Sequence, residues 1–213
     1  MDDEIYQVKS LANTLKIIEN ETRHIHPDYS EKTLRKKANK VFKEFAEEEF
    51  LIQFNEHMQE FYKNDVIGEE RSLRSKSYIL EGNSDSILGM FTIRLESLDI
   101  SKLTIDLKEK VILHGKNVVN TSVIPCYLIE EIAKNSKYND NPINLDTLVK
   151  SALMEIKIVQ SIIGGDLVIL NSICVDKVIK KYHDIGFADL SAKYTPKGSS
   201  DSYQPMYMRM NMP

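Results

Sequence analysis

The order of elements in this chain is decided by residues 124–187, which read IPCYLIEEIAKNSKYNDNPINLDTLVKSALMEIKIVQSIIGGDLVILNSICVDKVIKKYHDIGF. Ile124–Lys134 is mostly apolar, which is typical of a strand in the interior of a sheet. A polar loop and then a helix with apolar residues at helical spacing are expected over Lys137–Ile163. Asp166–Ile173 predicts a second strand, and Asp176–Asp184 predicts a short helix.

The junction between the first strand and the long helix is suited to a phosphate group. Asn144 is placed to cap the helix, and Gly164-Gly165 supplies the left-handed residue that commonly ends one. The first N–H groups of a helix have no partner within it and carry partial positive charge. The loop at Lys137–Asn144 therefore lies where a phosphate can bind.

The first 62 residues carry helical patterns. Residues 5–25 place apolar side chains near a three-to-four spacing, and Ser30 is a plausible N-cap for a second, longer helix. A third apolar set continues to Tyr62. The charged runs Arg35-Lys36-Lys37 and Glu47-Glu48-Glu49 are expected to be solvated helix faces.

From residue 77 the period changes to that of strands. Ser77–Leu80 and Ile87–Leu95 flank a turn-rich connector and predict a hairpin. Residues 97–122 mix charge with short apolar runs and are expected to form a long connection with one helical turn. Phe187–Tyr194 and Ser202–Met210 predict a terminal hairpin.

Composition indicates an ordinary globular protein. Of 213 residues, 42% are hydrophobic and 28% charged, and no apolar run approaches the roughly 18 residues that a membrane span needs. The acidic start, Met1–Glu4, has no signal-peptide pattern, so a cytoplasmic location is expected. The net charge of −4 argues against a nucleic-acid partner held through its phosphates.

The cysteines and histidines favour neither a disulfide nor a metal site. Cys126 and Cys174 lie in apolar, strand-like sequence and are expected to be buried free thiols. The histidines have no metal-ligand spacing, and His24-Ile25-His26 would place two imidazoles on different sides of a helix. No metal is therefore expected.

At this point the order of elements resembles the GNAT superfamily, the acyl-CoA-dependent N-acyltransferases. Gly89–Ile93 resembles the strand that often begins with Gly, Ile129–Lys134 matches the central strand in pattern, and Val178–Phe187 matches the late helix and following strand. The resemblance implies an α/β fold with a central mixed, largely antiparallel sheet flanked by helices. It places a GNAT-like acyltransferase domain at 63–213 and an N-terminal helical extension at 1–62.

The resemblance also implies catalytic residues. Tyr182 matches the family's general acid, and a phenol with a pKa near 10 stays protonated at neutral pH and can donate to a departing thiolate. Glu130 and Glu131 are the carboxylates available as base, and strand alternation sends them to opposite faces. Packing of Tyr182 in the core and ordinary salt bridges for the two glutamates are the alternatives.

Acetyl-CoA is the cosubstrate that the resemblance implies. The pantetheine arm would pair with the strand backbone at 132–134, and the loop would hold the pyrophosphate. The residues expected to contact it are Ile132, Ala133, Lys134, Lys137, Tyr138, Asn139, Asn141, Ile143 and Asn144.

The loop departs from the family's Gln/Arg-x-x-Gly-x-Gly/Ala pattern because Tyr138–Asn144 contains no glycine. Pro142 has no N–H to donate, and Asp140 adds repulsive charge. Asn139, Asn141 and Asn144 soften the objection, since Asn tolerates left-handed conformations and carries amide donors. Lys134 and Lys137 could neutralise phosphate charge.

Three functions remain open. The leading hypothesis is an N-acetyltransferase that passes acetyl from acetyl-CoA to a primary amine of an unknown acceptor. The second is a catalytically inactive GNAT-fold module whose N-terminal helices bind a protein partner. The third is a toxin-like acetyltransferase that acts on aminoacyl-tRNA, for which the chain offers only the basic clusters Arg35–Lys43 and Arg71–Lys76.

Overall fold

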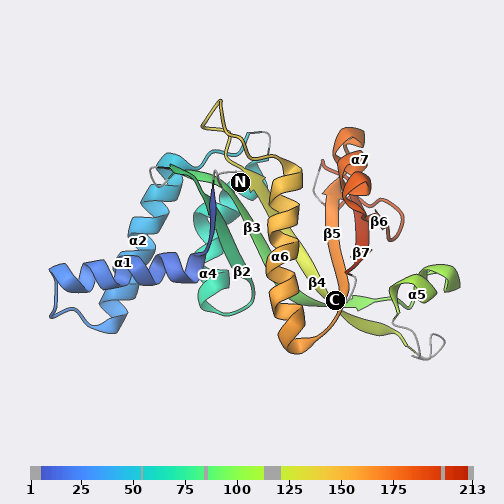
Figure 1. Cartoon of the computed structure of the whole chain (residues 1–213), viewed down its shortest axis with the longest axis horizontal. Helices are drawn as coiled ribbons and strands as arrows, with labels where there is room; N and C mark the ends of the chain where they lie inside the picture. The colour runs from blue at the N-terminus through green and yellow to red at the C-terminus, as the bar shows by residue number, and fades with distance from the viewer. Residues whose placement is uncertain (1–5, 54, 84–85, 113–120, 198–199, 211–213) are drawn as a thin grey trace, which may run out of the picture. The chain divides into compact units, whose positions relative to one another are not determined.

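The computed structural model describes residues 6–53, 55–83, 86–112, 121–197 and 200–210 (Figure 1). In chain order its elements are β1 (Gln7–Ser10), α1 (Leu11–Ile25), α2 (Glu31–Glu49), α3 (Glu56–Glu60), the π-helical segment η1 (Phe61–Asp65), α4 (Val66–Arg71), β2 (Lys76–Glu81), β3 (Ile87–Asp99), α5 (Ile105–Val111), β4 (Val123–Lys134), α6 (Leu145–Ile163), β5 (Leu167–Ile173), α7 (Asp176–Ile185), β6 (Ala188–Asp189) and β7 (Tyr203–Arg209).

Within the described residues the strands form a seven-stranded sheet in the order β1-β2-β3-β4-β5-β7-β6. β1 is antiparallel to β2, with Gln7 opposite Glu81. β4 and β5 are parallel, with Leu128 opposite Ile169. β7 is antiparallel to both β5 and β6. The sheet is therefore mixed and largely antiparallel, as predicted.

The chain forms two compact units. The first comprises Met1–Thr92 and Glu131–Ser151, and the second comprises Ile93–Glu130 and Ala152–Pro213. The predicted domain boundary at residue 62 stays a prediction. No helix of the described residues is long and apolar enough to cross a membrane.

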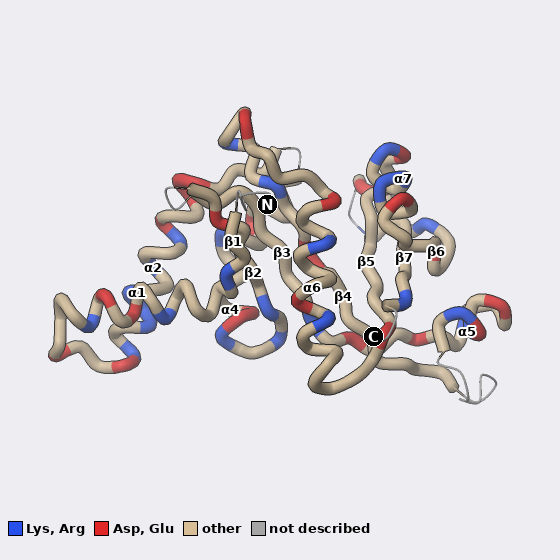
Figure 2. Tube along the Cα trace, in the orientation of Figure 1, with Lys and Arg blue, Asp and Glu red and all other residues tan. Residues whose placement is uncertain are grey.

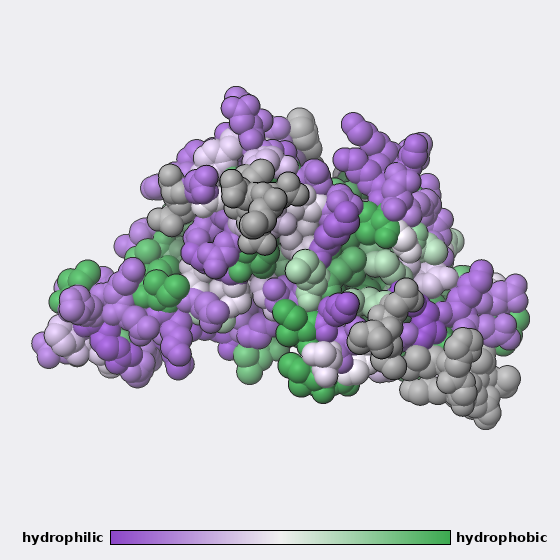
Figure 3. All heavy atoms as spheres, in the orientation of Figure 1, coloured by the Kyte–Doolittle hydropathy of each residue, from purple (hydrophilic) through white to green (hydrophobic). Residues whose placement is uncertain are grey.

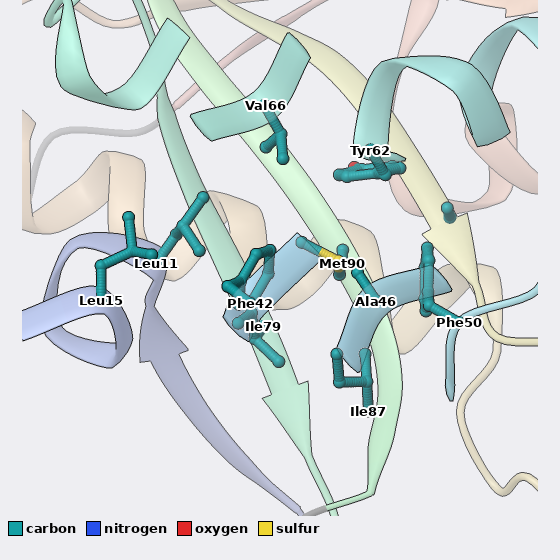
Figure 4. Close-up of a cluster of buried hydrophobic side chains, with 11 residues drawn as sticks. Leu11, Leu15, Phe42, Ala46, Phe50, Tyr62, Val66, Ile79, Ile87 and Met90 are labelled. Atoms are coloured by element: carbon teal, nitrogen blue, oxygen red, sulfur yellow. The ribbon is translucent and has the colours of Figure 1, made fainter. Parts of the chain in front are cut away.

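The first unit has its own core between helices and strands (Figure 4). In α2 the buried residues Leu34, Ala38, Phe42 and Ala46 follow one another at spacings of four, which places them on one helical face. Ser30 caps this helix, and its Oγ accepts a hydrogen bond from the Thr33 N–H at 3.3 Å. The labelled side chains of Figure 4 that meet at this core are Leu11, Leu15, Phe42, Ala46, Phe50, Tyr62, Val66, Ile79, Ile87 and Met90.

Two parts of the N-terminal helical prediction were wrong. Residues 7–10 form strand β1 rather than helix, because the backbone pairs with β2 and the Ser10 Oγ starts α1 by accepting from the Asn13 N–H. The helix expected to continue to Tyr62 is interrupted after Glu49. There the Ile52 N–H donates to the Gln59 side chain at 2.6 Å, which competes with helical bonding.

The second unit has a core drawn from β4, β5, β7 and the connection after β3. Its members are Ile100, Val111, Ile112, Ile124, Cys126, Leu128, Leu167, Ile169, Leu190 and Tyr207. The long connection contains α5, two turns rather than one, and its residues 113–120 lie outside the described part of the chain. The terminal hairpin is present as β6, a bridge from Tyr194 to Tyr203, and β7; Gly198-Ser199 at its turn lie outside the described residues.

Helix α6 has the bounds predicted for it, and Gly164 and Gly165 follow it at φ 77° and 87°. Its second half presents Met154, Ile158 and Ile162 to solvent, opposite the face that carries buried Ala152 and Ile156. Figure 3 shows green apolar side chains at the surface near the end of this helix. Apolar residues thus lie on two faces of α6, and only one of these faces is buried in the core.

Candidate functional site

Asn135 organises the loop after β4, and its side chain makes four hydrogen bonds within the first unit. Its Oδ1 accepts from the N–H of Leu51 at 3.1 Å and of Lys137 at 2.9 Å. Its Nδ2 donates to the carbonyl oxygens of Glu49 and Ile87, both at 2.6 Å. Asn135 is fully buried, so the amide supplies partners that water cannot. It fixes the loop to the end of α2 and the start of β3.

Asn141 shapes the same loop from its other side. Its Nδ2 donates to the carbonyl oxygens of Leu88 at 2.7 Å and Asn135 at 2.8 Å, and its Oδ1 accepts from the Ile143 N–H at 3.0 Å. Its own carbonyl oxygen accepts from the Lys134 Nζ at 2.9 Å. Both amide donors of this buried side chain are therefore used on backbone carbonyls of β3 and the loop rather than offered to a ligand.

The tip of the loop is a turn in which the Asn141 N–H donates to the Tyr138 carbonyl at 3.2 Å. Leu73 is the only non-glycine of the described residues with a positive φ, so the asparagines here do not use the left-handed conformation that the sequence allowed them. The N–H groups of Tyr138, Asn139 and Asp140 have no hydrogen-bond partner among the described residues. The loop keeps free donors without glycine.

The start of α6 provides further free donors. Asn144 caps the helix, and its Oδ1 accepts from the Thr147 N–H at 3.0 Å. The N–H groups of Asn144, Leu145 and Asp146 have no partner within the described part of the chain. They carry the partial positive charge of a helix N-terminus. Six backbone donors, three at the loop tip and three at the helix start, are thus available within one short segment.

Glu49, at the end of α2, holds two of the side chains expected to contact the cofactor. Its carboxylate lies 2.8 Å from the Lys137 Nζ and accepts from the Tyr138 hydroxyl at 2.8 Å. The Lys137 Nζ also donates to the Glu48 carbonyl at 2.8 Å. The hydrogen bonds from Lys137 and then Tyr138 lower the pKa of Glu49. Burial and the hydrogen bond to Glu49 raise the pKa of Tyr138, so both groups keep their usual charge at neutral pH.

Gly89 lets β3 pass close to the start of α6. A Cβ at this position would lie 2.8 Å from the Leu148 Cδ2 and 3.1 Å from the Ala133 carbonyl oxygen. Both distances are shorter than ordinary van der Waals contact. Of the strand residues expected beside the pantetheine, Ile132 is half-buried, Ala133 is buried and Lys134 is exposed.

In the second unit, Tyr182 lies at the end of α7 with 7% of its surface exposed. The carbonyl of Tyr182 accepts from the N–H of Phe187, and Gly186, at φ 114°, donates to the His183 carbonyl. This is a Schellman helix end, and the edge of one ring faces the other in the Tyr182–Phe187 pair, 5.8 Å apart. The pattern Tyr-x-x-x-Gly-Phe is therefore explained by the way these residues end helix α7.

The Tyr182 hydroxyl has no hydrogen-bond partner among the described residues. Burial raises the pKa of this phenol far above its ordinary value near 10. The hydroxyl is consequently protonated at neutral pH. Tyr182 thus packs against Phe187 through its ring and also carries a hydroxyl donor that is available for chemistry.

The two candidate bases follow one another along β4. The Glu130 Oε1 lies 3.1 Å from the Arg94 Nη1, and the Arg94 Nη2 lies 2.9 Å from the Glu96 carboxylate. Glu130 and Glu131 are both half-buried. Glu130 therefore has the salt-bridge partner that the sequence left open as its alternative.

Protein-family models and curated protein sequences give no match to this chain, whereas solved structures do. A structure described as a bacterial toxin aligns over 78% of this chain and 83% of its own, with 20% identity and a TM-score of 0.58. AtaT complexed with acetyl-methionyl-tRNAfMet aligns over 74% and 85%, with 18% identity and a TM-score of 0.55. AtaTR bound with AcCoA aligns over 96% and 94%, with 15% identity and a TM-score of 0.54. The chain has the GNAT fold.

The GNAT fold confirms the resemblance drawn from the strand–loop–helix–strand–helix order of residues 124–187. The alignment with AtaTR covers 96% of this chain, whereas the alignment with AtaT covers 74% of it. Strand β1 pairs with β2 in the sheet. The described residues contain no group of three or more side chains placed to hold a metal ion.

The sequence did not predict the roles of Asn135 and Glu49, whose contacts shape the loop between β4 and α6. A lone Asn after a strand is usually exposed, so nothing local marks Asn135 as buried. Glu49 belongs to a run of three glutamates that the sequence assigns to a solvated face. The contacts of both residues join segments more than 80 positions apart, and a single sequence carries no signal of that pairing.

Proposed function

We propose that this chain is an acetyl-CoA-dependent N-acetyltransferase that passes acetyl to a primary amine. The observation that carries the proposal is Tyr182, a buried, protonated phenol on α7 whose hydroxyl has no partner among the described residues. A core tyrosine normally satisfies its hydroxyl within the protein or at the surface. A phenol donor without a partner among the described residues is suited to protonating a departing sulfur.

In this proposal the acceptor nitrogen attacks the thioester carbonyl carbon, and the carbon–sulfur bond breaks. Tyr182 donates its proton to the sulfur as the sulfur leaves, and the phenolate regains a proton from solvent. Glu131 or Glu130 takes the proton that the amine must lose. The Glu130 Oε1 lies 3.1 Å from the Arg94 Nη1, and the proposal does not choose between the two carboxylates.

The cosubstrate would be held by the loop and the start of α6. The free N–H groups of residues 138–140 and 144–146 are suited to the pyrophosphate oxygens. Lys134 and Lys137 add positive charge, and the backbone at Ile132–Lys134 would pair with the pantetheine arm. The likeness in fold to AtaTR, a protein whose structure was solved with AcCoA bound, supports this assignment.

The test compares the natural chain with Tyr182→Phe. Calorimetry with acetyl-CoA should give a binding isotherm for both, and the thermal midpoints should agree because the hydroxyl makes no hydrogen bond to any residue that the structure describes. Acetyl transfer should fall by about 100-fold in the variant, the low end of what a positioned general acid contributes. Binding without any change in transfer rate would remove Tyr182 from the reaction. If the natural chain does not bind acetyl-CoA, the proposal that it is an acetyltransferase is wrong.

A second candidate acceptor is the amino group of an aminoacyl-tRNA. The likeness in fold to AtaT, solved with acetyl-methionyl-tRNAfMet, supports it. The net charge of −4 opposes it, since tRNA binding relies on phosphate contacts. Acetylation of charged tRNA in preference to free amines, with tRNA binding that weakens as salt rises, would favour this acceptor.

The glycine-free loop supports a further alternative, a GNAT-fold module without catalysis whose N-terminal helices bind a protein. Glu49 already engages Lys137 and Tyr138, and the Asn135 and Asn141 amides donate to backbone carbonyls of the protein. This alternative predicts no heat with acetyl-CoA and no effect of Tyr182→Phe on partner binding. The calorimetric titration with acetyl-CoA therefore separates this alternative from the enzyme.

A further inference from the structure

Residues of the two basic clusters, Arg35–Lys43 and Arg71–Lys76, line one cavity in the first unit. Arg35 on α2, Arg71 at the end of α4 and Lys76 at the start of β2 line one cavity of about 230 Å³. Its apolar wall is formed by Ala12 and Leu15 of α1. Figure 2 shows Lys and Arg in blue on α2 and along the connection from α4 to β2. We call this cavity the α1–α4 pocket.

We propose that the α1–α4 pocket binds an amphipathic oxyanion, a ligand with a phosphate or carboxylate head and a short apolar tail. Three cationic side chains converge from three elements, and an arginine fork matches the oxygens of either head group. Ala12 and Leu73 provide exposed apolar surface for the tail, whereas Leu15 behind them is fully buried. The cavity is large enough for a head group and a few methylenes.

The cations retain donors beyond those used in the fold. The Arg71 Nη2 pairs with Glu19 and donates to the Asn39 Oδ1, which leaves its Nε and Nη1. Lys76 uses one of its three donors on Glu70. Arg35 makes no hydrogen bond or ion pair with any described residue, so its whole guanidinium is available. Arg35 is therefore the principal head-group ligand.

Glu70, the one carboxylate in the lining, does not oppose an anion strongly. It is buried, and its two oxygens accept from the Lys76 Nζ at 2.6 Å and from the Ser77 N–H at 2.8 Å. Both oxygens are thus compensated on the protein side. Three cations then face two carboxylates, Glu70 and the Glu19 that pairs with Arg71, which leaves an excess of positive charge for a ligand.

Leu73 supplies an independent observation. It sits at the left-handed position of a Schellman helix end, where its N–H donates to Glu70 and the next N–H donates to the Glu69 carbonyl. Its φ of 60° costs a leucine about 1–2 kcal/mol that glycine would not lose. The side chain is nevertheless 77% exposed and lies at the pocket. A strained, exposed leucine at the rim is explained if it covers the tail of a ligand.

The experiment is calorimetric titration of the full chain, in the absence of acetyl-CoA, with two pairs of probes. Inorganic phosphate and butyl phosphate test one head group, and acetate and hexanoate test the other. The pair that binds more tightly identifies the head. In that pair the tailed probe should bind on the order of tenfold more tightly, since part of each buried methylene contributes. Equal affinity for tailed and tailless probes in both pairs would overturn the amphipathic assignment.

Three variants complete the design. Arg35→Gln should weaken the better probe about fivefold. Its matched control, Lys36→Gln, removes the same charge from the next residue of α2, which is exposed and does not line the pocket. Leu73→Gly should erase the advantage of the tail and raise the thermal midpoint. Equal effects of Arg35→Gln and Lys36→Gln, or no binding of any probe, would refute the site whether or not the chain binds acetyl-CoA.

Discussion

Replacing Asn135 by alanine should destabilise the chain strongly, because one buried amide joins four backbone groups. The variant leaves the carbonyls of Glu49 and Ile87 and the N–H groups of Leu51 and Lys137 without their partner. A hydrogen bond of this kind contributes about 1 kcal/mol net, so the four together contribute about 4 kcal/mol. For a chain of this size, 1 kcal/mol shifts the midpoint by about 2–4 °C. The expected fall is roughly 10 °C.

The assay is thermal unfolding followed by circular dichroism, with chemical denaturation as a second measure of the free energy of unfolding. Asn139→Ala is the matched control, because Asn139 is exposed in the same loop and its side chain has no hydrogen bond among the described residues. That variant should unfold within about 0.5 kcal/mol of the natural chain. A loss below about 1 kcal/mol in Asn135→Ala would refute the assignment of the loop's architecture to this amide.

Three further outcomes follow from particular contacts. Gly186→Ala should destabilise the end of α7 by about 1–2 kcal/mol, measured by denaturant unfolding, because φ 114° strains a residue with a Cβ. Burial, assisted by the Glu96 carboxylate, raises the pKa of Cys126 from 9.0 to about 11. The unfolded chain therefore ionises this thiol at lower pH than the folded chain does, so the free energy of unfolding should fall as pH rises from about 9 to about 11. At pH 8 an alkylating reagent should label half-buried Cys174 before buried Cys126. If acetyl-CoA binds, Glu49→Gln should tighten binding about threefold by freeing the Lys137 ammonium, and weaker binding would show that Glu49 positions the lysine instead.

Much of the fold is predictable from local signals in the sequence. The bounds of α6 follow from an Asn cap, a regular apolar spacing and two glycines, all of which act within a few residues of the helix end. Strand β1 is different, because Gln7–Ser10 gains its conformation by pairing with β2 more than 60 residues away. No local pattern separates these residues from the apolar face of the helix that follows.

The candidate residues divide in the same way. Tyr182 is found from sequence because Gly186 and Phe187 form its helix end within five residues. The sequence also predicts that Asn144 caps α6. The roles of Asn135 and Glu49 cannot be predicted from the sequence, since each residue contacts a partner in a distant segment. Helix caps and other features formed within a few residues can be predicted from one sequence, whereas hydrogen bonds between distant segments become known only from the three-dimensional structure.

The loop after β4 contains no glycine, although loops of this kind in the GNAT family usually do, and the hydrogen bonds of Asn135 and Asn141 explain how it still turns. Glycines in such loops give the backbone freedom to turn and to aim N–H groups at phosphate. Here two buried amides, Asn135 and Asn141, hold the turn instead, and every described residue of the loop keeps a negative φ. The donors at residues 138–140 and 144–146 are still left free. Since these hydrogen bonds hold the turn, replacing an outer residue with glycine should loosen the loop; if acetyl-CoA binds, this change should weaken its binding rather than strengthen it.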